Sequence, residues 1–203
     1  VYLQVRLRNT GQSIARALWA EVTALHPAAQ MIDSVAIYPD IPAGELDYGT
    51  PPFSFSVDAA SADGQVVEFR IDVRDSTGGL WSETFAFEVH APRLELYVNS
   101  IYDGAPYGNG NGIIEDGEQF QLRIGVKNFG SGTAYGLHGK IRAQDSGVTV
   151  VDSTASYEDI PLLGVEYGDG FVLSEEDAGI ENHFAFELVD HYGRLFSKRI
   201  ELR

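Results

Sequence analysis

The sequence of 203 residues predicts an all-β protein that contains two copies of one antiparallel β-sandwich domain. Three observations lead to this prediction: an internal repeat, apolar residues that alternate with polar ones, and turn-forming residues between the alternating segments. Hydrophobic residues make up 44% of the chain, which is enough to build a packed core.

An internal repeat relates the two halves of the chain at a spacing of 119 residues. The matched residues of the first half are Leu3, Asn9, Gly11, Ala15, Leu18, Tyr38 and Asp40-Ile41-Pro42, and their partners are Leu122, Asn128, Gly130, Ala134, Leu137, Tyr157 and Asp159-Ile160-Pro161. After a length change in one loop the spacing becomes 115, at which Asp75 matches Asp190. The repeat predicts two domains, residues 1–91 and 92–203, with a boundary at Ala91-Pro92, where a proline separates two extended segments.

The two copies differ in length at their start. Residues 93–119 precede Phe120, the partner of Val1, and the first copy has no such stretch. We therefore expect the first copy to be cut short at its N-terminus, without an opening strand and loop.

Alternation with a period of two residues identifies the strands in both copies. In chain order the inward-facing sets are Leu3-Val5-Leu7, Val67-Phe69-Ile71-Val73, Phe85-Phe87-Val89, Leu122-Ile124-Val126 and Phe184-Phe186-Leu188. The Ala- and Leu-rich segment 14–25 is the nearest approach to a helix, but its counterpart 133–143 contains Gly136 and Gly139, which disfavour a helix. We expect a strand in both copies. About seven short strands in a domain of about 100 residues are typical of an immunoglobulin-like sandwich of two antiparallel sheets.

Composition excludes several classes of function. The chain carries 30 acidic and 14 basic side chains, a net charge of −16, which repels nucleic acid and anionic membranes. The chain has no cysteine, so disulfides and thiol chemistry are excluded. No apolar run approaches the roughly 20 residues that span a bilayer, and we expect no membrane insertion.

One segment, residues 103–118, has the spacing of a calcium-binding loop. Asn109, Asn111, Gly112, Ile113 and Glu118 occupy positions three, five, six, seven and twelve of the twelve-residue loop. Position one holds Tyr107 in place of the usual aspartate. The candidate calcium ligands are Asp103, Asn109, Asn111, the Ile113 carbonyl, Asp116 and Glu118. A stretch rich in glycine and asparagine is also the composition of a plain turn, and both alternatives stay open.

The same loop resembles a known family of repeats. Residues 108–118 (GNGNGIIEDGE), followed by Val126–Gly130 and Thr133-Ala134, are similar to the signature of CARDB-like, Ig-like repeats of secreted and cell-surface bacterial and archaeal proteins. Such repeats follow catalytic domains, including gingipain-type cysteine peptidases, as non-catalytic spacers or stalks. Asn111 and Asp116 differ from the aspartate and proline that the family usually has there.

Nothing in the sequence indicates a catalytic site. The five histidines are scattered, and no G-x-S-x-G motif occurs. Carbohydrate binding is an alternative, for which the candidate ligand-facing residues are Trp19, Tyr102 and Tyr107, because these have no aromatic counterpart in the other copy. The aromatic residues that recur, Tyr38, Tyr48, Tyr157 and Tyr167, are expected to pack in the core or to fix loops.

The sequence therefore predicts a non-catalytic spacer, stalk or interaction module of a larger secreted or cell-surface protein, stabilised by calcium. The expected partners are neighbouring domains of the same polypeptide, a glycan or another surface protein. The alternatives are a carbohydrate-binding module and an accessory domain of a secreted peptidase or glycosidase.

Overall fold

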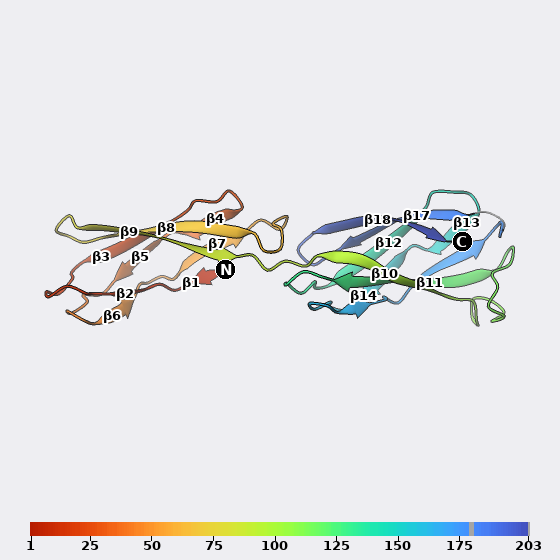
Figure 1. Cartoon of the computed structure of the whole chain (residues 1–203), viewed down its shortest axis with the longest axis horizontal. Coiled ribbons are helices and arrows are strands. Elements are labelled where there is room, and N and C mark those ends of the chain that lie inside the picture. Colours follow the sequence, from red (N-terminus) through yellow and green to blue (C-terminus); the bar gives the residue numbers. More distant parts are fainter. Residues whose placement is uncertain (179–180, 203) are drawn as a thin grey trace. The chain divides into compact units, whose positions relative to one another are not determined.

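The computed structural model describes residues 1–178 and 181–202. Every regular element in this part of the chain is a β-strand, and all strand pairs are antiparallel, which confirms the all-β prediction. Contacts divide the chain into two compact units, Val1–Val89 (unit 1) and His90–Arg203 (unit 2) (Figure 1). No helix in the described residues has the length and apolarity needed to cross a membrane.

Unit 1 packs small antiparallel sheets around one core. Its strands are β1 (Tyr2–Leu3), β2 (Arg6–Arg8), β3 (Leu18–Ala24), β4 (Ala29–Asp33), β5 (Val35–Tyr38), β6 (Leu46–Tyr48), β7 (Phe53–Val57), β8 (Val66–Arg74) and β9 (Leu80–Glu88). The sheets have the orders β1-β7-β4, β2-β6 and β5-β3-β8-β9. Phe55 of β7 and Phe69 of β8 meet in the core with ring centroids 4.8 Å apart, so the first and third sheets face each other.

Unit 2 has the same kind of layered arrangement with larger sheets. Its strands are β10 (Leu94–Tyr102), β11 (Gln119–Asn128), β12 (Leu137–Ala143), β13 (Val148–Asp152), β14 (Thr154–Tyr157), β15 (Val165–Glu166), β16 (Phe171–Glu175), β17 (Asn182–Val189) and β18 (Leu195–Leu202). One sheet has the order β10-β11-β16-β13 with β15 beside β11, and the other has the order β14-β12-β17-β18. Phe171 and Phe186 join the two sheets with ring centroids 6.1 Å apart.

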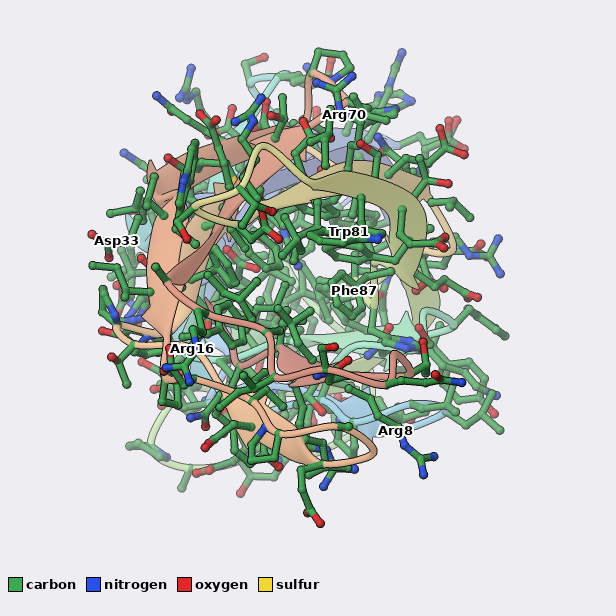
Figure 2. All side chains as sticks on the ribbon, turned by 90° about the vertical axis from the view of Figure 1, so that its left-hand side faces the viewer. Arg8, Arg16, Asp33, Arg70, Trp81 and Phe87 are labelled. Atoms are coloured by element: carbon green, nitrogen blue, oxygen red, sulfur yellow. The ribbon has the colours of Figure 1, made fainter. Side chains whose placement is uncertain are left out.

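The alternating pattern predicts most inward faces. In β8, Val67, Phe69, Ile71 and Val73 are buried and their neighbours are not. Within the segment 14–25, residues Leu18–Ala24 form the strand β3 rather than a helix. Phe87 also faces the core, since its ring centroid lies 6.1 Å from that of Phe55 and 5.9 Å from that of Phe69, but the residue stays 40% exposed (Figure 2). β9 forms the edge of its sheet, so no further strand of that sheet extends past it.

A fully buried asparagine organises one corner of unit 2. The Asn128 amide donates from Nδ2 to the carbonyls of Gly132 (2.8 Å) and Ile160 (2.9 Å). Its Oδ1 accepts hydrogen bonds from the N–H groups of Gly130 (2.9 Å) and Arg93 (3.0 Å). One side chain therefore ties together three separate chain segments, and its hydrogen-bonding groups are satisfied away from water.

The same corner occurs in unit 1 at a spacing of 119 residues. Asn9 donates from Nδ2 to the carbonyls of Ser13 (2.7 Å) and Ile41 (2.8 Å), and its Oδ1 accepts from the Gly11 N–H (2.9 Å). The fourth bond of Asn128, from the Arg93 N–H, has no counterpart at Asn9 among the described residues. Asn9 is only partly buried.

Two tyrosines make a second recurring contact. Tyr38 donates from its hydroxyl to the Val5 carbonyl and Tyr157 to the Ile124 carbonyl, both at 3.1 Å, so the donors and the acceptors are each 119 residues apart. Burial raises the pKa of Tyr38 to about 12 and also raises the pKa of Tyr157. Both residues pack in the core as expected. Tyr48 is 44% exposed beneath the Arg6 guanidinium, so it does not pack in the core.

We predict that Asn128→Ala destabilises unit 2 by about 3 kcal/mol, because it leaves buried N–H and carbonyl groups without partners. Asn9→Ala is the matched control and costs about 1 kcal/mol, because its site is less buried. Urea unfolding, followed through the backbone NMR signals of each unit, measures both values. Equal effects of the two variants would contradict the role assigned to burial at Asn128.

Candidate metal-binding sites

The loop of residues 103–118 closes the hairpin of β10 and β11, in which Tyr102 pairs with Gln121. Three of its glycines, Gly110, Gly112 and Gly117, have positive φ angles. Gly112, with φ of 81°, falls at the sixth position of the calcium-loop spacing, where that loop needs a sharp turn. The backbone thus makes the predicted turn at the predicted residue.

Side-chain oxygens of the loop accept hydrogen bonds from its own backbone. Asp103 reaches across the loop, and its Oδ2 accepts from the Gly112 N–H at 2.8 Å. Asn109 Oδ1 accepts from the Asn111 N–H (2.9 Å), and Asn111 Oδ1 accepts from the Ile113 N–H (2.7 Å). These contacts hold three of the candidate ligand oxygens within one short turn of chain.

Glu118 joins the end of the loop to its beginning. Its Oε1 accepts from the Asn109 N–H at 2.8 Å, and its Oε2 accepts from the Glu115 N–H at 3.1 Å. Asp103, Asn109, Asn111 and Glu118, four of the six candidate ligands, thus all accept hydrogen bonds from N–H groups of the loop. An oxygen that accepts one N–H bond keeps a second lone pair for a cation.

The other two candidates lie differently. Asp116 turns toward another segment, where its Oδ1 accepts from the Ala178 N–H at 2.7 Å. Ile113, whose carbonyl is the sixth candidate, stays in the turn, because its N–H donates to Asn111 Oδ1. Glu115 is placed in the loop instead, because its Oε2 accepts from Asn109 Nδ2 at 2.9 Å.

A cavity of about 310 Å³ lies beside the loop and contains a buried carboxylate. Asp103, Gly112, Ile114, Phe120 and Glu175 are among its lining residues. Glu175 is only 6% exposed, and its backbone bonds to Gly117 and Glu118. The sequence pattern of acidic residues at 175–177 favours a solvated loop, which is wrong for Glu175. The signal that identifies it is alternation, since Phe171, Leu173 and Glu175 face inward together in β16.

A second group of metal-ligating side chains escaped the sequence analysis. Glu181, His183 and Glu201 place one possible ligand atom each within 4.8 Å of the others. His183 and Glu201 are cross-strand partners in β17 and β18, far apart in sequence. Asp145 orients the imidazole, because its Oδ2 lies 2.7 Å from His183 Nδ1 and accepts from the His183 N–H. The Glu-x-His spacing of Glu181 and His183, at the start of β17, is the signal that the sequence could have offered.

The candidate ligand-facing aromatic residues are engaged by neighbouring side chains. The Arg74 guanidinium lies 4.8 Å from the Trp19 ring centroid. Tyr102 and Tyr107 pack edge to face with centroids 6.5 Å apart, and the Tyr102 hydroxyl donates to the Ala105 carbonyl at 3.2 Å. Each of these rings therefore has a structural contact of its own.

No family model and no curated protein matches the sequence. Two solved structures are similar to the chain. One is the YadV chaperone, with 11% identity and a TM-score of 0.28, covering 99% of this chain and 92% of that chain. The other is a protein of unknown function from Porphyromonas gingivalis W83, with 15% identity and a TM-score of 0.26, covering 98% of this chain and 89% of that chain. At these TM-scores neither likeness supports a conclusion about this protein.

We predict that the Asp145 carboxyl titrates below its ordinary pKa of 3.8, because hydrogen bonds from the His183 side chain and backbone stabilise the carboxylate. A lowered folded-state pKa means that this contact contributes stability above the unfolded-state pKa and loses it as the pH falls through the folded-state pKa. Carboxyl-carbon NMR titration measures the shift. His183→Ala should return the pKa toward 3.8, and an unchanged titration curve would contradict the assignment.

Proposed function

We propose that the chain is a non-catalytic spacer or interaction module of two tandem immunoglobulin-like sandwiches, in a larger secreted or cell-surface protein, with calcium bound in the loop 103–118. The recurrence of the asparagine and tyrosine contacts at one spacing supports the tandem arrangement. Two facing antiparallel sheets around one core in unit 2 support the sandwich.

The observation that carries the calcium proposal is that the side-chain oxygens of four candidate ligands are held by the backbone of one loop. Asp103, Asn109, Asn111 and Glu118 offer carboxylate and amide oxygens, the ligands that calcium prefers. Asp103 supplies the carboxylate that Tyr107 cannot supply at the first loop position. Asp116 is not included in the set, because it caps Ala178.

Calcium in this loop would stiffen the connection between β10 and β11. Without an ion, the loop keeps its form through hydrogen bonds at exposed sites, which contribute little because water competes for the same groups. A cation held by the same oxygens would add a cross-link that the unfolded chain lacks. This is the role expected of a stabilising ion in a chain without disulfides.

The family proposal rests on the same loop and the strand after it. The resemblance of residues 108–134 to CARDB-like repeats supports a spacer beside a catalytic domain, with neighbouring domains as partners. Carbohydrate binding has less support, because Trp19, Tyr102 and Tyr107 are each engaged by a neighbour within their own unit.

Calorimetry of the whole chain in EDTA, calcium or magnesium tests the proposal. We predict that calcium raises the unfolding temperature of unit 2 and leaves that of unit 1 unchanged, with a stabilisation of about 2.7 kcal/mol at a hundredfold excess over Kd. Asp103→Asn and Glu118→Gln should weaken calcium binding at least tenfold. Asp116→Asn is the matched control and should leave it unchanged. Identical transitions in EDTA and calcium would contradict the proposal.

A further inference from the structure

Three metal-ligating side chains lie together at the pair of strands β17 and β18 in unit 2. Glu181, His183 and Glu201 each offer one ligand atom, and these atoms all lie within 4.8 Å of one another. The Nε2 atom of His183 and the Oε1 atom of Glu201 are 3.9 Å apart. None of the three belongs to the loop 103–118, and the proposed function makes no use of them.

The pairing of β17 with β18 brings the three side chains to one face of the sheet. His183 and Glu201 are cross-strand partners in this antiparallel pair, and such partners have Cβ atoms about 4.5–5.5 Å apart. Glu181 precedes His183 by two residues, so the period of a strand points both side chains to the same side. The alternating residues Asn182 and Phe184 are buried in the core, so the ligand side chains face away from it.

A fourth residue, Asp145, holds the imidazole of His183 in place. Its Oδ2 lies 2.7 Å from His183 Nδ1 and also accepts from the His183 backbone N–H at 2.8 Å. The Gln144 N–H donates to the His183 carbonyl at 2.8 Å, which anchors the segment that carries Asp145 against β17. An acceptor at Nδ1 favours the tautomer with its proton there, which leaves the Nε2 lone pair for a metal. A carboxylate that orients the imidazole in this way is a regular partner of metal-binding histidines.

The ligand atoms can close around one ion while the backbone stays as it is. Zinc holds nitrogen and oxygen ligands at about 2.0–2.2 Å, so the ligand atoms around it lie about 3–4 Å apart. The His183 side chain is 20% exposed and is fixed by Asp145, so its Nε2 defines where an ion binds. The Glu201 side chain is 53% exposed, and a rotation within it shortens the separation of 3.9 Å from Nε2.

The donor set suits zinc better than calcium or magnesium. Calcium takes about six to eight oxygen ligands, whereas this group offers one imidazole nitrogen and two carboxylates. Magnesium also prefers oxygen and keeps several of its waters, so the imidazole selects against it. Zinc binds both kinds of donor, and three protein ligands with one water complete its four-coordinate shell.

Unit 1 shows that the fold does not require these side chains. At the spacing of 115 residues the counterparts of the three ligands are Val66, Glu68 and Ala86. Glu68 pairs with Ala86 in β8 and β9 as His183 pairs with Glu201 in β17 and β18, so the positions are equivalent in register. Valine and alanine have no donor atom for a metal. The ligand group is therefore a feature of unit 2 alone and not a by-product of strand pairing.

We propose that Glu181, His183 and Glu201 form a zinc-binding site on the outer face of β17 and β18, with Asp145 as the positioning residue of the imidazole. His183 Nε2 and one carboxylate oxygen from each glutamate bind the ion, and water takes the fourth position. The ion cross-links two strands whose ligands are distant in sequence, and so it stabilises their pairing. The proposal does not depend on calcium binding in the loop 103–118.

Titration of zinc into the whole chain in saturating calcium, followed by calorimetry and by the imidazole nitrogen NMR signals, tests the proposal. We expect saturable binding that shifts the Nε2 signal of His183. His183→Gln and Glu201→Gln should each weaken zinc binding at least tenfold, because each removes a ligand. Glu187→Gln is the matched control, since Glu187 lies on the same face of β17, and it should leave binding unchanged.

Asp145→Asn tests the positioning role separately. It should weaken zinc binding about tenfold or more, because a partner that orients a ligand histidine contributes to metal affinity. In the metal-free chain it should also change the tautomer of His183, measured from the two imidazole nitrogen shifts. An Asp145 that only stabilises the strand would leave the tautomer as it is.

Three results would overturn the proposal. The first is no binding of zinc in saturating calcium. The second is binding that shifts other histidines and leaves the Nε2 signal of His183 unchanged. The third is equal zinc affinity of the Glu201→Gln and Glu187→Gln variants. The NMR signal of His183 is measured in the unaltered chain, so this part of the test does not depend on the folding of any variant. Asp103→Asn, which removes a calcium ligand, should leave zinc binding unchanged, so the zinc and calcium proposals fail separately.

Discussion

The pairing of β10 along β11 is the interaction on which unit 2 depends. It gives β11 a hydrogen-bonding partner on its second side and covers the faces of Leu122, Ile124 and Val126. The chain that leads into β10 also places the Arg93 N–H on Asn128, which completes the set of bonds around a buried amide. Because an unsatisfied buried amide costs stability, the strand and the asparagine depend on each other. The loop 103–118 then holds the two strands of this hairpin together.

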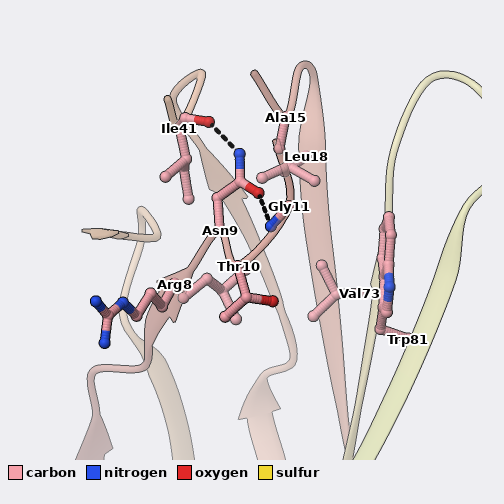
Figure 3. A pocket seen from close by; sticks show the side chains of 10 residues that line it. Arg8, Asn9, Thr10, Gly11, Ala15, Leu18, Ile41, Val73 and Trp81 are labelled. Carbon is pink, nitrogen blue, oxygen red and sulfur yellow. Dashed lines mark hydrogen bonds between the residues drawn. The ribbon is translucent and has the colours of Figure 1, made fainter. Parts of the chain in front are cut away.

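Unit 1 contains the same asparagine corner and tyrosine contact as unit 2. Asn9 makes three of the four bonds that Asn128 makes, and Tyr38 makes the bond that Tyr157 makes, so the corner and the tyrosine bond form in both units. In the described residues of unit 1, Trp81 is 54% and Phe87 40% exposed, and a cavity of about 420 Å³ lies beside Asn9 (Figure 3).

Sequence alone predicts the elements that depend on local pattern. Alternation places Phe69 and Phe184 inside, and the repeat identifies Asn9 with Asn128 and Tyr38 with Tyr157 before any contact is known. Features that depend on the path of the chain between strands are not predictable in this way. Asp116 accepts a hydrogen bond from the Ala178 N–H, and His183 lies opposite Glu201 in a strand pair. Neither contact is predictable from local pattern, because the partners are not neighbours in sequence. Glu175 is buried by the alternation of β16, although its acidic neighbours indicate a solvated loop.

Native-state hydrogen exchange of the whole chain tests most directly the claim that pairing with β10 stabilises β11, so that residues 120–128 of unit 2 are better protected than residues 1–9 of unit 1. The exchange rates of residues 1–9 are compared with those of β8 in the same unit, and the rates of residues 120–128 with those of β17. We predict that the amides of residues 120–128 exchange as slowly as those of β17, whereas the amides of residues 1–9 exchange at least tenfold faster than those of β8. Protection of residues 1–9 equal to that of β8 would contradict it.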